Sequence, residues 1–279
     1  DWLVQGNIVE NADYAGIELT NVTNSRVLDN EITGPASIAN DPGDAGVGIE
    51  IATRAHFGTL VAGTDITVSG NEITGTFAAD SRTAINLLSR AYDSGSSDAT
   101  LSGVTVSGNT ITGSGTRGVN IVAESRGGHL STVSGLTITG NTLSGNTAGI
   151  EIGYAGGAHA DGTYDAGTLT IETNKFDGNT NFGVRNLTGT LINAANNWWG
   201  DATGPMNAAT NLSGLGNSVS DNVTFDPWYT DAEKTTTSAD VAAAKTTAHD
   251  ALTVALATYS EGDYSAENWT TLNGFKTTG

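Results

Sequence analysis

The chain has 279 residues, a formal net charge of -19 and no cysteine. Its 37 glycines accompany a hydrophobic content of 37%, which is too high for a disordered Gly/Ser tract and predicts a folded, β-rich chain. The negative charge argues against a nucleic-acid partner. The lack of cysteine excludes disulfides and thiolate metal sites, and no apolar run is long enough to span a membrane.

The opening stretch, DWLVQGNIVEN, begins inside a pattern that recurs through residues 1–230. We therefore expect the chain to be a piece of a longer protein. Each copy has an apolar residue, an Asn three positions later and a Gly four positions after the Asn. The copies are VLDNEITG (27–34), VSGNEITG (68–75), VSGNTITG (106–113), ITGNTLSG (138–145), IETNKFDG (171–178) and the degraded NNWWG (196–200).

A second phrase follows each copy, as GIEL (16–19), GIEI (48–51), AINL (84–87), GVNI (118–121), GIEI (149–152) and GVRN (183–186). Its alternation of apolar and other residues predicts short strands with one face buried. The shortest spacings between the asparagines, 22 and 23 residues, suit one coil of a parallel β-helix. We predict an all-β parallel β-helix over residues 1–230.

Two columns of side chains follow from this register. We expect the asparagines to stack at one corner of successive coils and to hydrogen-bond along the column. They are Asn30, Asn71, Asn109, Asn141 and Asn174. The glycines at the following bend should supply left-handed backbone conformations. They are Gly34, Gly75, Gly113, Gly145 and Gly178.

These phrases resemble the right-handed parallel β-helix repeat proteins, a superfamily that includes pectate-lyase-like enzymes and many bacterial and archaeal surface proteins. The resemblance implies a right-handed solenoid. NNWWGDATGP (196–205) with VSDNVTFDPWYTD (219–231) is similar to the closing motif of such surface proteins, so we place the end of the solenoid near 196–229. In this register we expect Trp198 to face inward and cap the core, and Trp199 to point outward. A sugar-stacking platform is the alternative.

Longer segments follow the second phrase in the middle coils, at 52–65, 88–103, 122–135 and 153–167. Insertions on one face of a solenoid often form its binding face. We predict contacts with copies of the chain or with a cell-surface glycan there, the alternative being loops that merely carry polar residues. The predicted contact residues are Arg54, His56, Arg90, Tyr92, Arg126, His129, Tyr154, His159 and Tyr164.

Catalysis would need paired carboxylates or a bound cation beside a base. The middle position of the second phrase gives an outward column: Glu18, Glu50, Asn86, Asn120, Glu151 and Arg185. Glu18 and Glu50 on adjacent coils would be about 5 Å apart, as in retaining glycosidases, although acids on an exposed sheet commonly just face water. A lyase would instead use Arg54 or Arg90 as the base beside acid-bound Ca²⁺.

Calcium is the one cofactor that the sequence suggests, through three acids near the closing motif. These are Asp201, Asp221 and Asp226. Acid-rich turns more often bind no metal. Asn-X-Ser/Thr glycosylation signals occur at Asn21, Asn211, Asn222 and Asn268.

The remaining residues, 231–279, change to a helical pattern. Apolar residues at steps of three and four from Val241 to Tyr259 predict an amphipathic helix with Thr237 or Ser238 as N-cap. Ser265 should cap a second helix. ALATYSEGDYSAENWTTL (255–272) is similar to FIVAR-type helical modules, which occur in tandem in large microbial cell-surface proteins. The resemblance implies a truncated bundle followed by further domains of the same chain.

We therefore expect a non-catalytic structural or adhesive domain of a surface layer, sheath or adhesin. It would lie outside the cell, on the surface of a bacterium or archaeon. The alternative is a carbohydrate-active β-helix enzyme, either a polysaccharide lyase or a glycoside hydrolase.

Overall fold

The computed structural model describes residues 1–12, 14–34, 46–55, 61–75, 83–92, 97–113, 115–153 and 160–278. The chain divides into two compact units, Asp1–Thr235 and Thr236–Gly279. The first is a parallel β-solenoid, here called the solenoid unit, and the second is a helical unit. Strands account for 47% of the structure, which confirms the all-β solenoid expected from the repeat.

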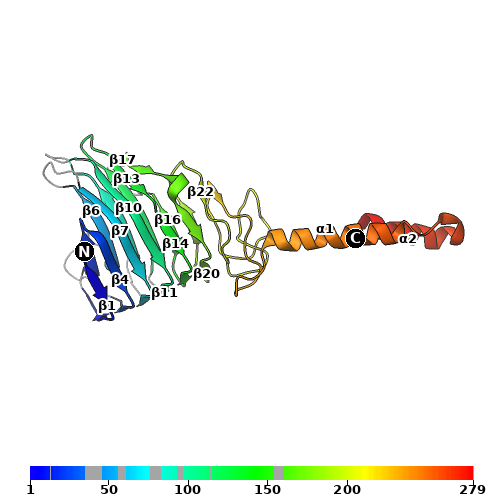
Figure 1. The fold of residues 1–279 in the computed structure, drawn as a ribbon, viewed down its shortest axis with the longest axis horizontal. Coiled ribbons are helices and arrows are strands. Elements are labelled where there is room, and N and C mark those ends of the chain that lie inside the picture. The colour runs from blue at the N-terminus through cyan, green and yellow to red at the C-terminus, as the bar shows by residue number, and fades with distance from the viewer. Residues whose placement is uncertain are drawn as a thin grey trace. The chain divides into compact units, whose positions relative to one another are not determined.

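Three parallel sheets form the solenoid, and their strands lie side by side in chain order from blue to green (Figure 1). Sheet A contains β1 (Leu3–Gln5), β4 (Thr23–Leu28), β7 (Val61–Ser69), β10 (Ala99–Ser107), β13 (Ser131–Ser134), β14 (Thr137–Thr139), β18 (Thr163–Tyr164) and β19 (Thr170–Glu172). Sheet B contains β2 (Ile8–Glu10), β5 (Glu31–Thr33), β8 (Glu72–Thr74), β11 (Thr110–Thr112), β15 (Thr142–Ser144) and β20 (Lys175–Asp177).

Sheet C contains β3 (Ala15–Thr20), β6 (Val47–Arg54), β9 (Thr83–Arg90), β12 (Arg117–Ser125), β16 (Ala148–Ile152) and β21 (Phe182–Asn186), with the short β17 (Ala160–Asp161) antiparallel to β12. The 3₁₀ turn η1 (Ala166–Thr168) precedes β19, and β22 (Ile192–Asn193) pairs with β23 (Val223–Thr224). Strands β6, β9 and β12 continue past the second phrase, so Arg54 and Arg90 end strands and do not lie in the loops where they were predicted.

The core fills the space between the sheets with columns of aliphatic side chains. On sheet C, Ile49 pairs in register with Ile85, and on sheet B, Ile73 pairs with Ile111. All four are fully buried. Each such side chain contributes about 1.5–3 kcal/mol through removal from water. The alternating phrases thus place their β-branched residues inward, as predicted.

The expected column of asparagines is present and is here called the asparagine ladder. Its members are Asn7, Asn30, Asn71, Asn109, Asn141, Asn174 and Asn197. Asn109 shows the pattern: its Nδ2 and its backbone N–H both donate to Asn141 Oδ1, at 2.9 and 3.0 Å. The Nδ2 also donates to the carbonyl of Val68 at 2.9 Å. From Asn30 onward, each coil is therefore tied to the next through buried, satisfied amides.

Left-handed backbone flanks the ladder on both sides. Predicted bend glycines with positive φ are Gly75, Gly113, Gly145 and Gly178. The residue directly before each ladder asparagine is also left-handed, which the sequence analysis did not foresee. These residues are Gly6, Asp29, Gly70, Gly108, Gly140, Thr173 and Asn196. Gly, Asp and Asn tolerate this conformation best, which explains most of the residues found there.

The end of the ladder lies one residue later than predicted. Asn197, not Asn196, accepts from the backbone N–H and the Nδ2 of Asn174, at 2.8 and 3.1 Å. Asn196, with φ 56°, takes the left-handed position before the ladder. Asparagine suits both the left-handed position and the ladder position that follows it. The sequence therefore does not distinguish which of the two adjacent asparagines belongs to the ladder.

This shift exchanges the predicted roles of the two tryptophans. Trp199 is fully buried and stacks on Phe176, with ring centroids 4.8 Å apart and planes at 16°. Trp198 pairs with Lys175 as an isolated bridge and is half-buried. The prediction that Trp198 faces inward and caps the core is therefore wrong. The neighbouring Trp199 takes that place, stacked on Phe176.

The helical unit contains α1 (Ser238–Leu256), the 3₁₀ turn η2 (Glu261–Asp263) and α2 (Ala266–Thr278). Thr237 caps α1 by accepting from the backbone N–H of Asp240, whose carboxylate accepts from Thr237 in return. Ser265 caps α2 through the backbone N–H of Asn268 at 3.3 Å. Both predicted helices are thus present, and no residue of α1 is buried.

Candidate functional site

Sheet C carries the predicted catalytic column on the side away from the core. Neighbouring strands hold its members in register, from Glu18 paired with Glu50 to Glu151 paired with Arg185. We call this column the outer ladder; its members are Glu18, Glu50, Asn86, Asn120, Glu151 and Arg185. Three groups of arginines and carboxylates form along it and along the carboxyl ends of the same strands.

The first group joins the two predicted catalytic acids through one arginine. Arg54 donates through Nη1 to Glu18 at 2.7 Å and through Nη2 to Glu50. Glu50 is only 3% exposed, so the expectation that this acid faces water is wrong. Its other oxygen accepts from Asn86 at 3.0 Å, and Asn86 in turn accepts from Asn120 at 2.9 Å. The carboxylate is thereby part of a hydrogen-bonded chain that crosses four coils.

Charge pairing keeps Arg54 protonated. Burial works against its charge, but Glu50, Tyr14 and Glu18 together outweigh burial, and the pKa of Arg54 lies above its ordinary value. Arg54 also donates to the hydroxyl of Tyr14 at 3.1 Å. Burial and the nearby Glu50 raise the pKa of Tyr14. A lyase base must lose its proton, which this environment disfavours.

The second group surrounds Glu124, an acid that the sequence analysis did not single out. Glu124 is fully buried and pairs with both Arg90 and Arg126. Burial opposes the charge of Arg90, but Glu124 and Tyr92 together outweigh burial, and the pKa of Arg90 is raised. The guanidinium of Arg126 lies 5.4 Å from the ring centroid of Tyr92, within the range of a cation–π contact. Three of the predicted contact residues therefore do lie together.

The third group holds Glu151, which is 3% exposed. Arg117 pairs with one carboxylate oxygen, and Arg185 donates to the other at 3.0 Å. The guanidinium of Arg185 lies 5.7 Å from the ring centroid of Phe182. Arg117 was missed by the sequence analysis, because it opens a strand and belongs to neither recurring phrase.

The other predicted contact residues are not gathered in this way. Tyr164 belongs to the core; its hydroxyl accepts from the Ala123 backbone N–H and donates to Asp161, both at 2.8 Å. Burial raises the pKa of Tyr164, and its predicted place on a contact surface is wrong. His129 lies 3.8 Å from Asp98 at the turn after β12. The rest, His56, Tyr154 and His159, lie outside the described residues.

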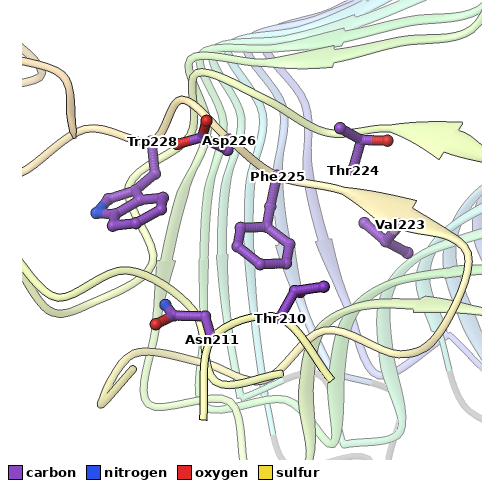
Figure 2. A pocket seen from close by; sticks show the side chains of 7 residues that line it. All are labelled: Thr210, Asn211, Val223, Thr224, Phe225, Asp226 and Trp228. Atoms are coloured by element: carbon purple, nitrogen blue, oxygen red, sulfur yellow. The ribbon is translucent and has the colours of Figure 1, made fainter. Parts of the chain in front are cut away.

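The proposed calcium ligands do not form a cluster. Asp201 accepts from the hydroxyl and the backbone N–H of Thr203, at 2.7 and 2.9 Å, and these bonds lower its pKa. Across the ranges that the structure describes, no three His, Cys, Asp or Glu residues are grouped as a metal site would need. Asp226 instead lines a cavity of about 450 Å³ in the closing segment, with Phe225, Trp228 and other residues (Figure 2).

No protein-family model matches the chain, and no curated protein matches it. Among the described residues, no helix is both long enough and apolar enough to cross a membrane.

Proposed function

We propose that the chain is a non-catalytic structural or adhesive domain of a large microbial cell-surface protein. Sheet C, with its outer ladder and arginine groups, would form the surface that contacts copies of the chain or a glycan. The observation that carries this proposal is the concentration of arginines on one face of a chain whose net charge is -19. They are Arg54, Arg90, Arg117, Arg126 and Arg185.

The state of the carboxylates supports a structural role over a catalytic one. A glycosidase needs one acid that holds a proton and one that attacks or activates water. Glu18 and Glu50 are instead bridged by the same guanidinium, which occupies one oxygen of each carboxylate. Glu124 and Glu151 are each enclosed by two arginines. Such ion pairs suit a rigid surface that keeps its shape.

Partial exposure of the arginines supports a contact role. The side chain of Arg185 is 42% exposed and that of Arg90 29%. Arginine is favoured at contact surfaces because its planar fork binds carboxylates and its face stacks on aromatic rings. The resemblance of residues 255–272 to FIVAR-type modules favours placement in a large surface protein that carries helical modules.

The test uses the intact chain. Self-association is measured by sedimentation velocity over a range of concentrations, and glycan binding on an array that includes acidic polysaccharides. We expect one of these activities to weaken at least about tenfold in Arg126→Ala and Arg185→Ala, because contact arginines often dominate binding. The matched control is Arg26→Ala, an exposed arginine on β4 of sheet A.

Two outcomes would overturn the proposal. The first is equal loss of binding in the Arg26 control, which would mean that general charge and not sheet C is responsible. The second is shortening of a polysaccharide by the wild-type chain that disappears in Glu18→Gln, which would favour the enzymatic alternative.

A further inference from the structure

The cavity in the closing segment has one aromatic wall and one polar wall. Phe225 and Trp228 follow β23 and form the first, with ring centroids 6.1 Å apart and planes at 45°. Thr210 and Asn211 lie across the cavity from them, on the preceding loop (Figure 2). Asp226 also lines the cavity. Its volume of about 450 Å³ falls within the range of small-ligand sites.

The aromatic wall is fixed before any ligand arrives. The Nε1–H of Trp228 donates to the carbonyl of Ala202 at 3.1 Å. Gly204 lies so close to the ring that a Cβ there would come within 2.5 Å of it. The indole hydrogen is thus used within the protein. The indole of Trp228 therefore offers flat apolar surface and π-electron density to a ligand, whereas Phe225, only 7% exposed, belongs to the core beside it.

The polar wall is fixed as well, and what it offers a ligand is hydrogen-bond acceptors. Asn211 Nδ2 donates to the carbonyls of Thr203 and Pro205, at 3.0 and 2.8 Å. These bonds determine the orientation of the amide, which identifies Oδ1 as the acceptor. The Thr210 hydroxyl donates to Asn207 Oδ1 at 3.0 Å, so its lone pairs remain to accept. Asp226, when ionised, is an acceptor only.

Charge narrows the class of ligand. The chain carries a net charge of -19, an acid lines the cavity, and no Lys or Arg is among the described residues that line it. Anionic ligands are therefore disfavoured. A flat apolar face that stacks on the rings, with several O–H donors around its edge, would match both walls. A neutral pyranose sugar has this combination.

We propose that the cavity binds a neutral pyranose, such as the terminal residue of an uncharged glycan. The site lies in the closing segment and not on sheet C, so it goes beyond the proposed function and stands independently of it. Trp228 would stack against the C–H face of the sugar, and the buried Phe225 would form part of the apolar floor beside it. Asp226, Asn211 and Thr210 would accept bonds from its hydroxyls.

The experiment titrates the intact chain with the methyl glycosides of glucose, galactose and mannose, followed by tryptophan fluorescence and ligand-observed NMR. We expect at least one to bind with a Kd on the order of 1 mM, which is typical of so small a ligand. Asp226→Asn and Thr210→Val should each weaken binding about fivefold or more, through loss of an acceptor. Trp228→Ala should abolish it.

Controls separate loss of the site from loss of the fold. Leu212→Ala changes a 77% exposed neighbour that does not line the cavity and should bind like wild type. Melting curves identify any variant that fails to fold. If Trp228→Ala fails to fold, the two milder variants, Asp226→Asn and Thr210→Val, still test the site. Arg126→Ala and Arg185→Ala should retain sugar binding, so that failure here is distinguishable from failure of the proposed function.

Three results would overturn the proposal. One is that no neutral glycoside binds to the folded chain. Another is that binding survives in all cavity variants, which would place the sugar elsewhere. The third is that choline binds and the glycosides do not, which would make the cavity a cation site formed by aromatic rings and Asp226.

Discussion

The asparagine ladder and the outer ladder are both columns of polar side chains that cross the coils, yet they differ in regularity. The asparagine ladder uses the same residue throughout, and from Asn30 to Asn174 it repeats the same three bonds at every coil. The outer ladder changes from Glu to Asn and then to Glu and Arg, and its partners reach it from other positions. A role that every coil shares leaves a repeat in the sequence, whereas a role specific to one coil does not.

The largest expected loss of stability tests which residues end the asparagine ladder and the core column beside it. Trp199→Ala should lower the free energy of unfolding by about 3–5 kcal/mol, because a fully buried ring stacked on Phe176 is removed. Trp198→Ala, the matched control, should cost less than about 1 kcal/mol because that side chain is half-buried. Urea denaturation measures both. A larger loss of unfolding free energy in Trp198→Ala than in Trp199→Ala would contradict this result and favour Trp198 as the inward cap.

The next effect concerns the middle of the asparagine ladder. Asn141→Ala should cost about 3 kcal/mol, since it leaves the Asn109 donors and the Val106 carbonyl without their buried partner. Asn7→Ala, in the exposed first coil, should cost about 1 kcal/mol or less. Equal losses in urea denaturation would mean that the ladder does not act through buried hydrogen bonds.

A smaller effect is expected in the irregular region. Glu124→Gln should cost about 1–2 kcal/mol, because Arg90 and Arg126 lose their charge partner but remain partly hydrated, with 29% and 20% of their side chains exposed. Glu18→Gln, at a side chain 34% exposed, should cost less than about 0.5 kcal/mol. Thermal melts in low and high salt would check this. A larger loss of stability in Glu18→Gln than in Glu124→Gln would contradict the assignment of Glu124 as the buried acid and Glu18 as the exposed one.

The smallest effect is a pH dependence from Tyr164. Its folded-state pKa is raised above the ordinary value of 10.0 by burial, so its contribution to stability is complete below about pH 10. As pH rises further, only the unfolded chain ionises there, and stability should fall. Tyr164→Phe should reduce this alkaline slope, although Tyr14, whose pKa is also raised, contributes in the same direction. An unchanged slope would exclude Tyr164 as its source.

The features that every coil shares could be predicted from the sequence, and the features specific to one coil could not. The coils, the inward columns and the ladder from Asn30 to Asn174 were all evident from the two phrases, because stacking imposes the same residue type at each coil. The register at Asn196 and Asn197 was not, since both positions accept asparagine.

The arginine groups were less predictable than the coils. Arg54, Arg90 and Arg126 were noticed by composition, but the pairs Arg54–Glu18 and Arg90–Glu124 depend on strand pairing across 36 and 34 residues. Glu124 stands two residues before Arg126 in VAESRGG, and an acid that close to an arginine at a strand end was the available signal. The cavity could not be predicted from the sequence, because it depends on how two segments of the closing motif fold against each other.

The most direct test of the central claim is the chain length of a polysaccharide incubated with the intact protein. Chromatography of the products, with glycans chosen from those that bind, would show whether the protein holds or cuts them. We predict an unchanged length distribution of the polysaccharide, together with weaker binding in Arg126→Ala or Arg185→Ala. Shortening of the polysaccharide that depends on Glu18 or Glu50 would contradict it.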